Sequence, residues 1–247
     1  MAPTWIAAVC GGIGTICFAL MLVPQVLLNT RRRSTEGLSW GLVLPWHVAG
    51  ILFVGVTLAH PQPSWFSALS MFSQVFCCGV CEVQMFCFKR IEKGCYRRLV
   101  MTVAYTVSTA LSCLACAGCY AYFTTASDNV DFILGELVPS ILIGLGFFPE
   151  FYEFISSMSI EGYSFGVTAF DVIGSAGNTV VYFMREDESW GERISEASPF
   201  LTIIVMHVIL VILAVWVVWH APSVKKEISD SDASTDASGA TETSQEV

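Results

Sequence analysis

Asp171 is an acidic residue within a run of apolar and small residues, Thr-Ala-Phe-Asp-Val-Ile-Gly-Ser. A charged carboxylate is costly in a low-dielectric surrounding, so an acid in such a run is a functional-site hypothesis by default. The chemistry that it suits is the reversible binding of a proton. We therefore expect Asp171 to carry a proton. A hydrogen-bonded structural carboxylate between helices is the alternative.

Three small or polar residues share the expected helix face of Asp171. Gly174, Ser175 and Asn178 follow it by three, four and seven residues, a spacing that places side chains on one side of a helix. Small residues permit close helix packing, and an Asn amide both donates and accepts hydrogen bonds. We expect Ser175 and Asn178 to bind a polar molecule or to pack at the wall of its cavity.

The elements that position these residues are predicted to be membrane helices. Of 247 residues, 54% are hydrophobic and 13% are charged, whereas about a quarter of a soluble domain is charged. A water-soluble globule is therefore excluded, and the net charge of −9 argues against nucleic-acid binding. Lipid leaves backbone groups no outside partner, which favours an all-α fold. Seven runs reach the roughly 20 residues that a span needs: Trp5–Leu28, Leu38–Ala59, Trp65–Phe88, Leu99–Phe123, Phe132–Phe151, Ser164–Met184 and Phe200–Trp219.

The distribution of Lys and Arg predicts the orientation of the spans. Ten of the 12 basic residues lie on one side of the predicted membrane, and only Arg185 and Arg193 lie on the other. Because positively charged loops stay in the cytosol, we expect a cytosolic C-terminus and a luminal or external N-terminus. The first run lacks a basic leader and is expected to stay as a span. The Ser-, Thr- and Asp-rich segment 223–247 is expected to be a disordered acidic cytosolic tail.

An internal repeat relates two stretches of the chain at an offset of 125 residues. Met21–His60 aligns with Gly146–Arg185 without a gap, and Gln25 falls on Glu150. Six polar, Gly or Pro positions are identical, which apolar bias alone does not produce. The identical pairs are Pro24/Pro149, Ser34/Ser159, Glu36/Glu161, Gly37/Gly162, Ser39/Ser164 and Gly41/Gly166.

The repeat predicts two similar three-helix units that cross the membrane in the same direction. The first unit covers residues 1–98, a linker helix and luminal loop cover 99–130, and the second unit covers 131–222. Three spans and one linker make an even number of crossings, so the units are parallel. Parallel repeats place a polar site at their interface near the middle of the bilayer.

The repeated motifs resemble those of the PQ-loop repeat family of membrane transporters. The motifs are Val-Pro-Gln-Val with Ser-Thr-Glu-Gly-Leu-Ser, and Phe-Pro-Glu-Phe with Ser-Ile-Glu-Gly-Tyr-Ser. The likeness covers Trp5–Trp219 in span number, repeat placement and orientation. It extends to cystinosin-like and vacuolar or lysosomal amino acid exporters, and to a fungal branch of the family. The resemblance implies seven helices in a three-one-three arrangement.

The resemblance also implies roles for motif residues. Pro24 and Pro149 would be hinges, with a static kink as the alternative. Gln25 matches the family motif, whereas Glu150 departs from it and is either hydrated or a titratable group at the cytosolic gate. Relatives have a proton-coupling Asp where this chain has Asp171.

Trp46 and several other polar residues in the apolar runs have open roles. Trp46 is the repeat equivalent of Asp171, and it either stacks on a substrate or packs as a bulky core residue. His47 would titrate near neutral pH. Gln74 and Glu82 lie eight residues apart and line a pore or pack. Asp131 and Glu136 bracket the luminal start of the fifth span, as interfacial groups or as guides for a cationic solute.

The residues do not indicate an enzyme, a cofactor or a metal site. The ten cysteines lie mostly in apolar runs and are expected to act as small apolar residues. We therefore expect a transporter whose partners are a small polar solute, protons and membrane lipid. The favoured solute is an amino acid, exported from a vacuole or lysosome to the cytosol by alternating access. A non-transporting receptor or assembly factor, or a facilitative sugar transporter, is the alternative.

Overall fold

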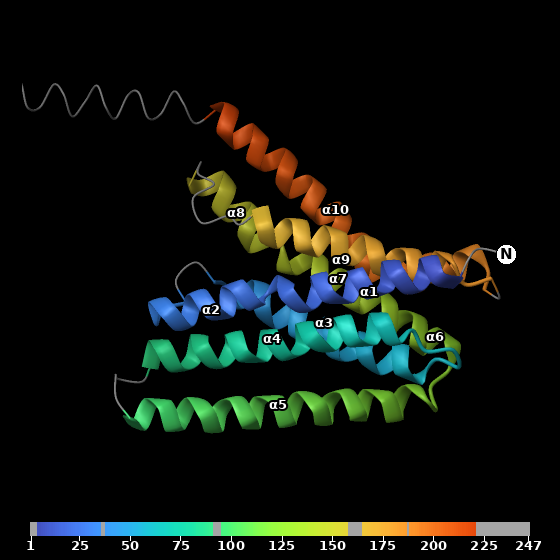
Figure 1. Ribbon diagram of the computed structural model, residues 1–247, viewed down its shortest axis with the longest axis horizontal. Helices are drawn as coiled ribbons and strands as arrows, with labels where there is room; N and C mark the ends of the chain where they lie inside the picture. Colours follow the sequence, from blue (N-terminus) through green and yellow to red (C-terminus); the bar gives the residue numbers. More distant parts are fainter. Residues whose placement is uncertain (1–3, 36–37, 91–94, 158–164, 187, 221–247) are drawn as a thin grey trace, which may run out of the picture.

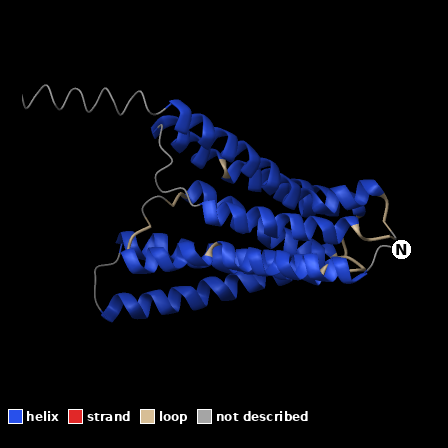
Figure 2. Cartoon of the chain, turned by 45° about the horizontal axis from the view of Figure 1, so that its top comes forward, coloured by secondary structure: helices blue, strands red, loops and turns tan. Residues whose placement is uncertain are grey.

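The computed structural model describes residues 4–35, 38–90, 95–157, 165–186 and 188–220 (Figure 1). The described chain is helical apart from short loops and contains no strand (Figure 2). This confirms the predicted all-α fold. The helices are α1 Thr4–Met21, α2 Val23–Arg32, α3 Trp40–Ala59, α4 Trp65–Arg90, α5 Cys95–Phe123, α6 Asp128–Val130, the π-helix η1 Asp131–Leu137, α7 Val138–Gly146, α8 Phe148–Ser157, α9 Phe165–Phe183 and α10 Trp190–His220.

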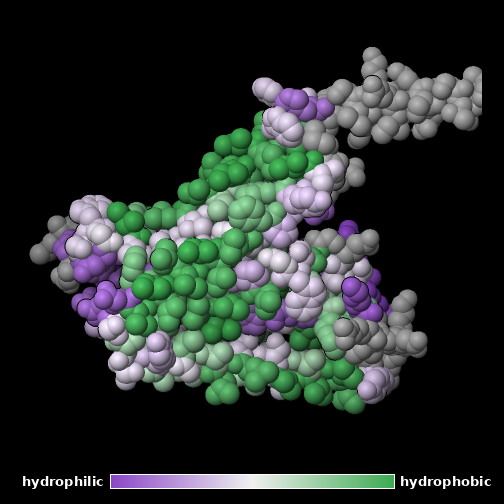
Figure 3. Space-filling model, turned by 180° about the vertical axis from the view of Figure 1, so that it is seen from behind, coloured by the Kyte–Doolittle hydropathy of each residue, from purple (hydrophilic) through white to green (hydrophobic). Residues whose placement is uncertain are grey.

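The described helices form seven long stretches, as predicted. Six of them are long and apolar enough to span a bilayer, and the seventh, the 19-residue helix α9, packs between them against α1 and α10. Large apolar side chains face outward along them, for example Leu114 at 69% exposure and Ile212 at 64%. Figure 3 shows hydrophobic side chains over the middle of one face and hydrophilic ones mostly toward its ends. An outward apolar surface of this kind fits lipid rather than water, so the chain is a multi-pass membrane protein.

The helices run along one axis between two opposite ends of the bundle. We call the end that holds the start of α1, His60 and Trp190 the N-terminal face, and the end that holds Arg32 and His220 the C-terminal face. In Figure 1, α1 and α7 both run from the N-terminal face toward the C-terminal face. The two repeats are therefore parallel, as the even number of crossings between them requires.

The helix packing has an approximate two-fold relationship. In the first unit, α4 packs against both α1 and α3; in the second, α10 packs against both α9 and α7. Across the units, α1 packs against α9 and α3 packs against α7. The offset of 125 residues exchanges these two seams. It also relates the first residues of α4 and α10, Trp65 and Trp190, so the repeat continues through the third helix of each unit.

Helix α5 packs against α3 and α4 and so accompanies the first unit. We refer below to α1–α5 as the first bundle and to η1–α10 as the second bundle. The residue boundaries proposed for the units remain predictions.

Both repeats have a break in their first crossing, two residues before the motif proline. The first break is at Leu22, before Pro24, and the second is at Phe147, before Pro149. Proline has no N–H to donate and its ring crowds the preceding turn, which explains the interruption. Pro45 and Pro199, by contrast, lie inside continuous helices.

Helix α10 begins ten residues before the predicted start of the seventh run at Phe200. Two reciprocal hydrogen bonds cap its first turn. Ser189 N donates to Glu192 Oε2 at 2.7 Å, and Glu192 N donates to Ser189 Oγ at 3.3 Å. This reciprocal pair is a capping box. A search for long apolar runs cannot find such a start, because the first turns of α10 are polar.

Several predicted motif residues lie outside the described part of the chain. They are Glu36, Gly37, Ser159, Glu161, Gly162 and Ser164, together with the tail 223–247.

Candidate functional site

Asp171 is completely buried between α9 and α10. Its Oδ2 lies 2.6 Å from Nε2 of His207, which is also buried. Among the described residues, Asp171 Oδ1 and His207 Nδ1 have no hydrogen-bond partner. The carboxyl group therefore points into the protein, and the pair leaves one free acceptor and one free ring nitrogen.

Buried polar atoms without a described partner also belong to Gln74, Ser175 and Thr179 within the helices, and to Asp131 and Glu188 near the N-terminal face. Both amide atoms of Gln74 are unpartnered, although its side chain is 1% exposed. A buried polar atom without a partner costs about 1–3 kcal/mol, so a native protein usually supplies water or a ligand there. We call Gln74, Ser175 and Thr179, together with Asp171 and His207, the central polar site.

Asn178 fixes the relative register of α4 and α9. Its Oδ1 accepts hydrogen bonds from Ser67 and Ser70 of α4, at 3.2 and 3.4 Å. The two helices run in opposite directions, so one turn toward the C-terminal face leads from Ser70 to Gln74 and from Asn178 to Ser175. Gln74 and Ser175 therefore lie at a similar depth.

The amide of Asn178 is fully used within the protein. Besides accepting from α4, its Nδ2 donates to Gly174 O at 2.9 Å and to Ser70 Oγ at 3.1 Å. Of the two arrangements expected for Asn178, the described contacts are those of a residue in the wall. Ser175 Oγ, by contrast, has no hydrogen-bond partner among the described residues.

Trp46 lies at the seam between α3 and α7. Its Nε1 donates to Ile143 O at 3.1 Å, and its ring packs 5.2 Å from the ring of Phe147. Phe147 in turn meets the ring of His207 edge-on at 4.9 Å. Trp46 of the first bundle therefore contacts Phe147, and Phe147 contacts His207 of the Asp171–His207 pair. Phe147 is also the residue at which the second helix break lies.

Gln25 and Glu150, the motif residues after the prolines, have different surroundings. Gln25 donates to Asn29 Oδ1, and Asn29 donates to Gln84 Oε1, both at 2.9 Å. This row of amides ties α2 to α4. Glu150 lies in the first turn of α8, close enough to Asp171 and His207 for an electrostatic interaction.

The two seams between the bundles differ at the C-terminal face. On one side Gly41 packs on Pro149 so closely that a Cβ there would lie 2.9 Å from Pro149 Cγ. On the other side a hollow of about 390 Å³ separates α2 from Phe170 of α9 and is lined in part by Pro24 and Arg31. One seam is therefore closed and its counterpart is open.

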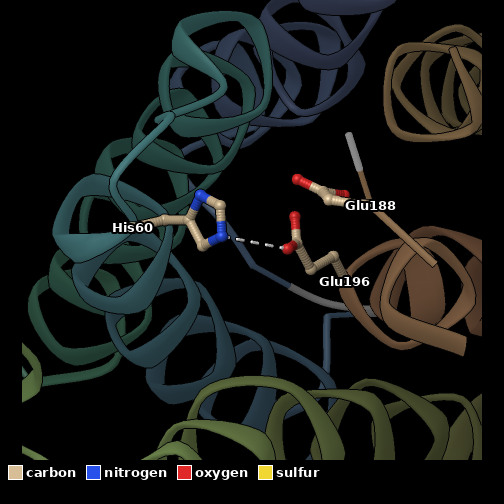
Figure 4. A group of neighbouring side chains, drawn as sticks. All are labelled: His60, Glu188 and Glu196. Carbon is tan, nitrogen blue, oxygen red and sulfur yellow. Dashed lines mark ion pairs between the residues drawn. The ribbon is translucent and has the colours of Figure 1, made fainter. Parts of the chain in front are cut away.

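The N-terminal face is held together by charged groups that cross from one bundle to the other. Arg185 Nη1 donates to Glu188 Oε1 at 2.8 Å and to Glu196 Oε2 at 2.5 Å. Arg185 Nη2 donates to Gln62 O at 2.9 Å, and His60 Nε2 lies 3.4 Å from Glu196 Oε1. We call these five residues the ionic lock. Figure 4 shows His60, Glu188 and Glu196 converging from the two bundles.

A hollow of about 650 Å³ opens beside the ionic lock. Ser195 of its wall donates a hydrogen bond to Glu136. His60, Glu188 and Glu196 offer ligand atoms within 4.8 Å of one another. Arg185 already donates to both carboxylates, so the described contacts are those of an ion-pair network. The acidic residues that line the hollow are Asp128, Asp131, Glu136, Glu188, Glu192 and Glu196.

The sequence analysis missed His207 and gave the lock residues no joint role. His207 has a recognisable signal, because it is an imidazole in the apolar run Ile-Ile-Val-Met-His-Val-Ile-Leu. It also stands 125 residues after Glu82, at the offset of the repeat. The Arg185–Glu196 contact has no such signal, since a turn between helices brings the residues together. The nine cysteines whose side chains are described are free thiols.

The fold and the site define a multi-pass helical membrane protein built from two parallel repeats. Comparison with known families gives a match of residues 6–66 to the PQ loop repeat. This confirms the resemblance drawn from the sequence motifs, with the match falling on the first repeat. The cystinosin-like branch remains a prediction.

A curated relative comes from fission yeast. An uncharacterized protein of Schizosaccharomyces pombe is 23% identical over 180 residues, which are 66% of this chain. The match spans 57% of the length of that relative.

Proposed function

We propose that this protein is a transporter that moves a small polar solute across the membrane by alternating access, with proton coupling at Asp171. The carrying observation is the central polar site. An acid and an imidazole are paired at 2.6 Å in a buried position, and each keeps one polar atom without a described partner. A site that can bind both a proton and a polar solute suits a coupled transporter better than an enzyme, since it lacks a nucleophile–base set.

Alternating access requires that the two faces open in turn, and the two seams support such movement. The ionic lock joins the bundles at the N-terminal face, while an open and a closed seam coexist at the C-terminal face. The breaks at Leu22 and Phe147 supply a bending point in each repeat. In this mechanism Pro24 and Pro149 are the hinges, and the bundles rock about the central polar site.

The orientation follows from charge, and the solute and the direction of transport follow from the resemblance to amino acid exporters. The positive-inside bias puts the N-terminal face in the lumen, so solute enters from the acidic hollow and leaves on the cytosolic side. We propose an amino acid as the solute and the vacuolar or lysosomal membrane as the location. In the bound state Ser175 and Gln74 contact the solute, and Asp171 exchanges the proton.

The test is uptake into proteoliposomes from a panel of amino acids and sugars, with and without an imposed pH gradient. The proposal predicts that at least one amino acid is taken up faster when the gradient is present. Liposomes without protein are the control. Uptake of sugars alone, unaffected by the gradient, would contradict proton coupling. If no solute is taken up and the interior of the protein is closed to water, the result would favour a receptor or assembly factor.

A further inference from the structure

A second imidazole–carboxylate pair lies in the first bundle. His47 Nδ1 is 2.9 Å from Glu82 Oε1, and the two side chains are 10% and 18% exposed. Helices α1 to α5 contain one carboxylate and one imidazole in total, and these are the two residues that meet. We therefore do not regard the contact between the single acid and the single imidazole of these five helices as a coincidence.

The repeat relates this pair to the one at the central polar site. The offset of 125 residues carries Glu82 onto His207 and carries Trp46, the neighbour of His47, onto Asp171. Each bundle therefore joins its second and third crossings by an acid and an imidazole at the same level, with the two residue types exchanged between the helices. The pair in the second bundle has unpartnered atoms, whereas the pair in the first bundle contacts the linker helix.

The linker helix contributes Ser112. His47 Nε2 lies 3.0 Å from Ser112 Oγ, and Ser112 Oγ donates to Ser108 O at 2.9 Å. A hydroxyl has one proton to donate. If that proton goes to Ser108 O, then Nε2 must carry a hydrogen and donate to Ser112. The proton of the 2.9 Å contact between Nδ1 and Oε1 then has to be a second one, held by either His47 or Glu82.

The net charge supports the second proton. With it, the pair is neutral overall, either as two neutral groups or as an ion pair. Without it, Glu82 leaves a net negative charge inside the membrane, which is costly. The nearest cation along α4 is Lys89, seven residues or about 10 Å from Glu82 along the axis.

The other titratable groups on the packed elements are not strong competitors for this proton. Cys78 and Cys81 of α4 lie in electrostatic range of Glu82. On α5 the titratable groups nearest Ser112 in sequence are Cys113, Cys116 and Tyr105, and the cations Arg97 and Arg98 lie near its start. Helix α3 has no titratable group besides His47.

We propose that His47 and Glu82 form a second proton-binding site, and that its state sets the direction of the hydrogen bond to Ser112 of the linker helix. With the proton bound, Nε2 donates to Ser112. On release, one proton leaves to water, and the remaining ring proton moves from Nε2 to Nδ1, where it donates to Glu82. Ser112 then turns its hydroxyl from Ser108 O to Nε2. Proton binding at this site therefore changes the hydrogen bond between α3 and α5. The site is separate from the proposed solute site.

The test is ¹⁵N NMR of the histidine rings of the full chain in nanodiscs. His60→Asn and His220→Asn remove two of the four imidazoles. Glu82→Gln then identifies His47, because Glu82 bonds His47 whereas His207 bonds Asp171. We expect Nε2 of His47 to carry a proton at the acidic end of a pH series and to lose it in favour of Nδ1 at the basic end. A permanent Nδ1–H form from about pH 6 to 9 would overturn the proposal.

Two variants connect the proton to the linker helix. Ser112→Ala removes the acceptor, so the Nε2 signal should move to the position of a nitrogen without a hydrogen bond. Ser73→Ala is the matched control, because Ser73 bonds a carbonyl of its own helix at an exposed position, as Ser112 does at a part-buried one. An unchanged Nε2 signal in Ser112→Ala would contradict the role of α5. These spectra need no transport, so they can fail while the proposed function stands.

Discussion

Asp171 Oδ2 and His207 Nε2 lie 2.6 Å apart, with side chains that are 0% and 5% exposed. A buried pair of this kind is weak evidence for stability in itself, but removal of one partner leaves the other uncompensated. The two side chains therefore form one hydrogen-bonded unit, whose outer atoms, Asp171 Oδ1 and His207 Nδ1, have no partner among the described residues.

Replacement of His207 by Leu should destabilise the protein. It leaves Asp171 buried and unpaired, and removal of one partner of a buried pair costs about 3–5 kcal/mol. Thermal unfolding in detergent or nanodiscs measures the loss. His220→Leu is the control, because His220 lies at the exposed end of α10. Equal unfolding temperatures for the two variants would show that the Asp171–His207 contact does not form.

Gly177→Ala should weaken the seam between α1 and α9. A Cβ at this position would lie 2.5 Å from Cys10 O and 2.9 Å from Gly14 Cα, so two backbones would have to separate. Overpacking of this kind costs about 1–3 kcal/mol. Gly12→Ala on α1 is the matched control, since its added Cβ meets nothing within 4 Å and Ala favours a helix. The account of close α1–α9 packing is wrong if both variants unfold at the wild-type temperature.

Arg185→Ala should open the N-terminal face. Without the guanidinium, Glu188 and Glu196 repel each other and the bond to Gln62 O is lost. We expect faster hydrogen exchange at the end of α9 and the start of α10. Arg98→Ala, at the opposite face, is the control. Unchanged exchange at these helix ends would mean that the ionic lock does not hold the bundles together.

Pro24→Ala and Pro149→Ala should slow transport if the breaks are hinges. Alanine restores the missing N–H and favours a continuous helix across the break. We expect a lower maximal uptake rate for each variant and the lowest rate for the double variant. Pro45→Ala is the control, because Pro45 lies inside the continuous helix α3. Wild-type rates in the double variant would indicate static kinks.

Much of the fold could be predicted from the sequence, because membrane helices and repeats leave direct signals. The apolar runs gave seven crossings, and the identical positions around Pro24 and Pro149 gave parallel repeats. The start of α10 could not be found in this way, since a capping box at Ser189 and Glu192 extends the helix into polar sequence. The sequence does predict the burial of Asp171, because an acid within a lipid-spanning run is expected to face the protein interior rather than lipid.

The partners of the site residues were harder to predict, because they depend on tertiary contacts. Nothing local to Asp171 points to His207, which lies 36 residues later on another helix. The repeat offset was the one available signal, since it relates His207 to Glu82. The contact of His47 with Glu82 and Ser112 likewise needs three helices in place.

Proton movement into proteoliposomes, recorded with a trapped pH-sensitive dye while solute is supplied, tests the central claim most directly. In Asp171→Asn the account predicts that solute-driven proton entry is lost while solute exchange across the membrane is kept. Solute-driven proton entry at the wild-type rate in Asp171→Asn would contradict the account.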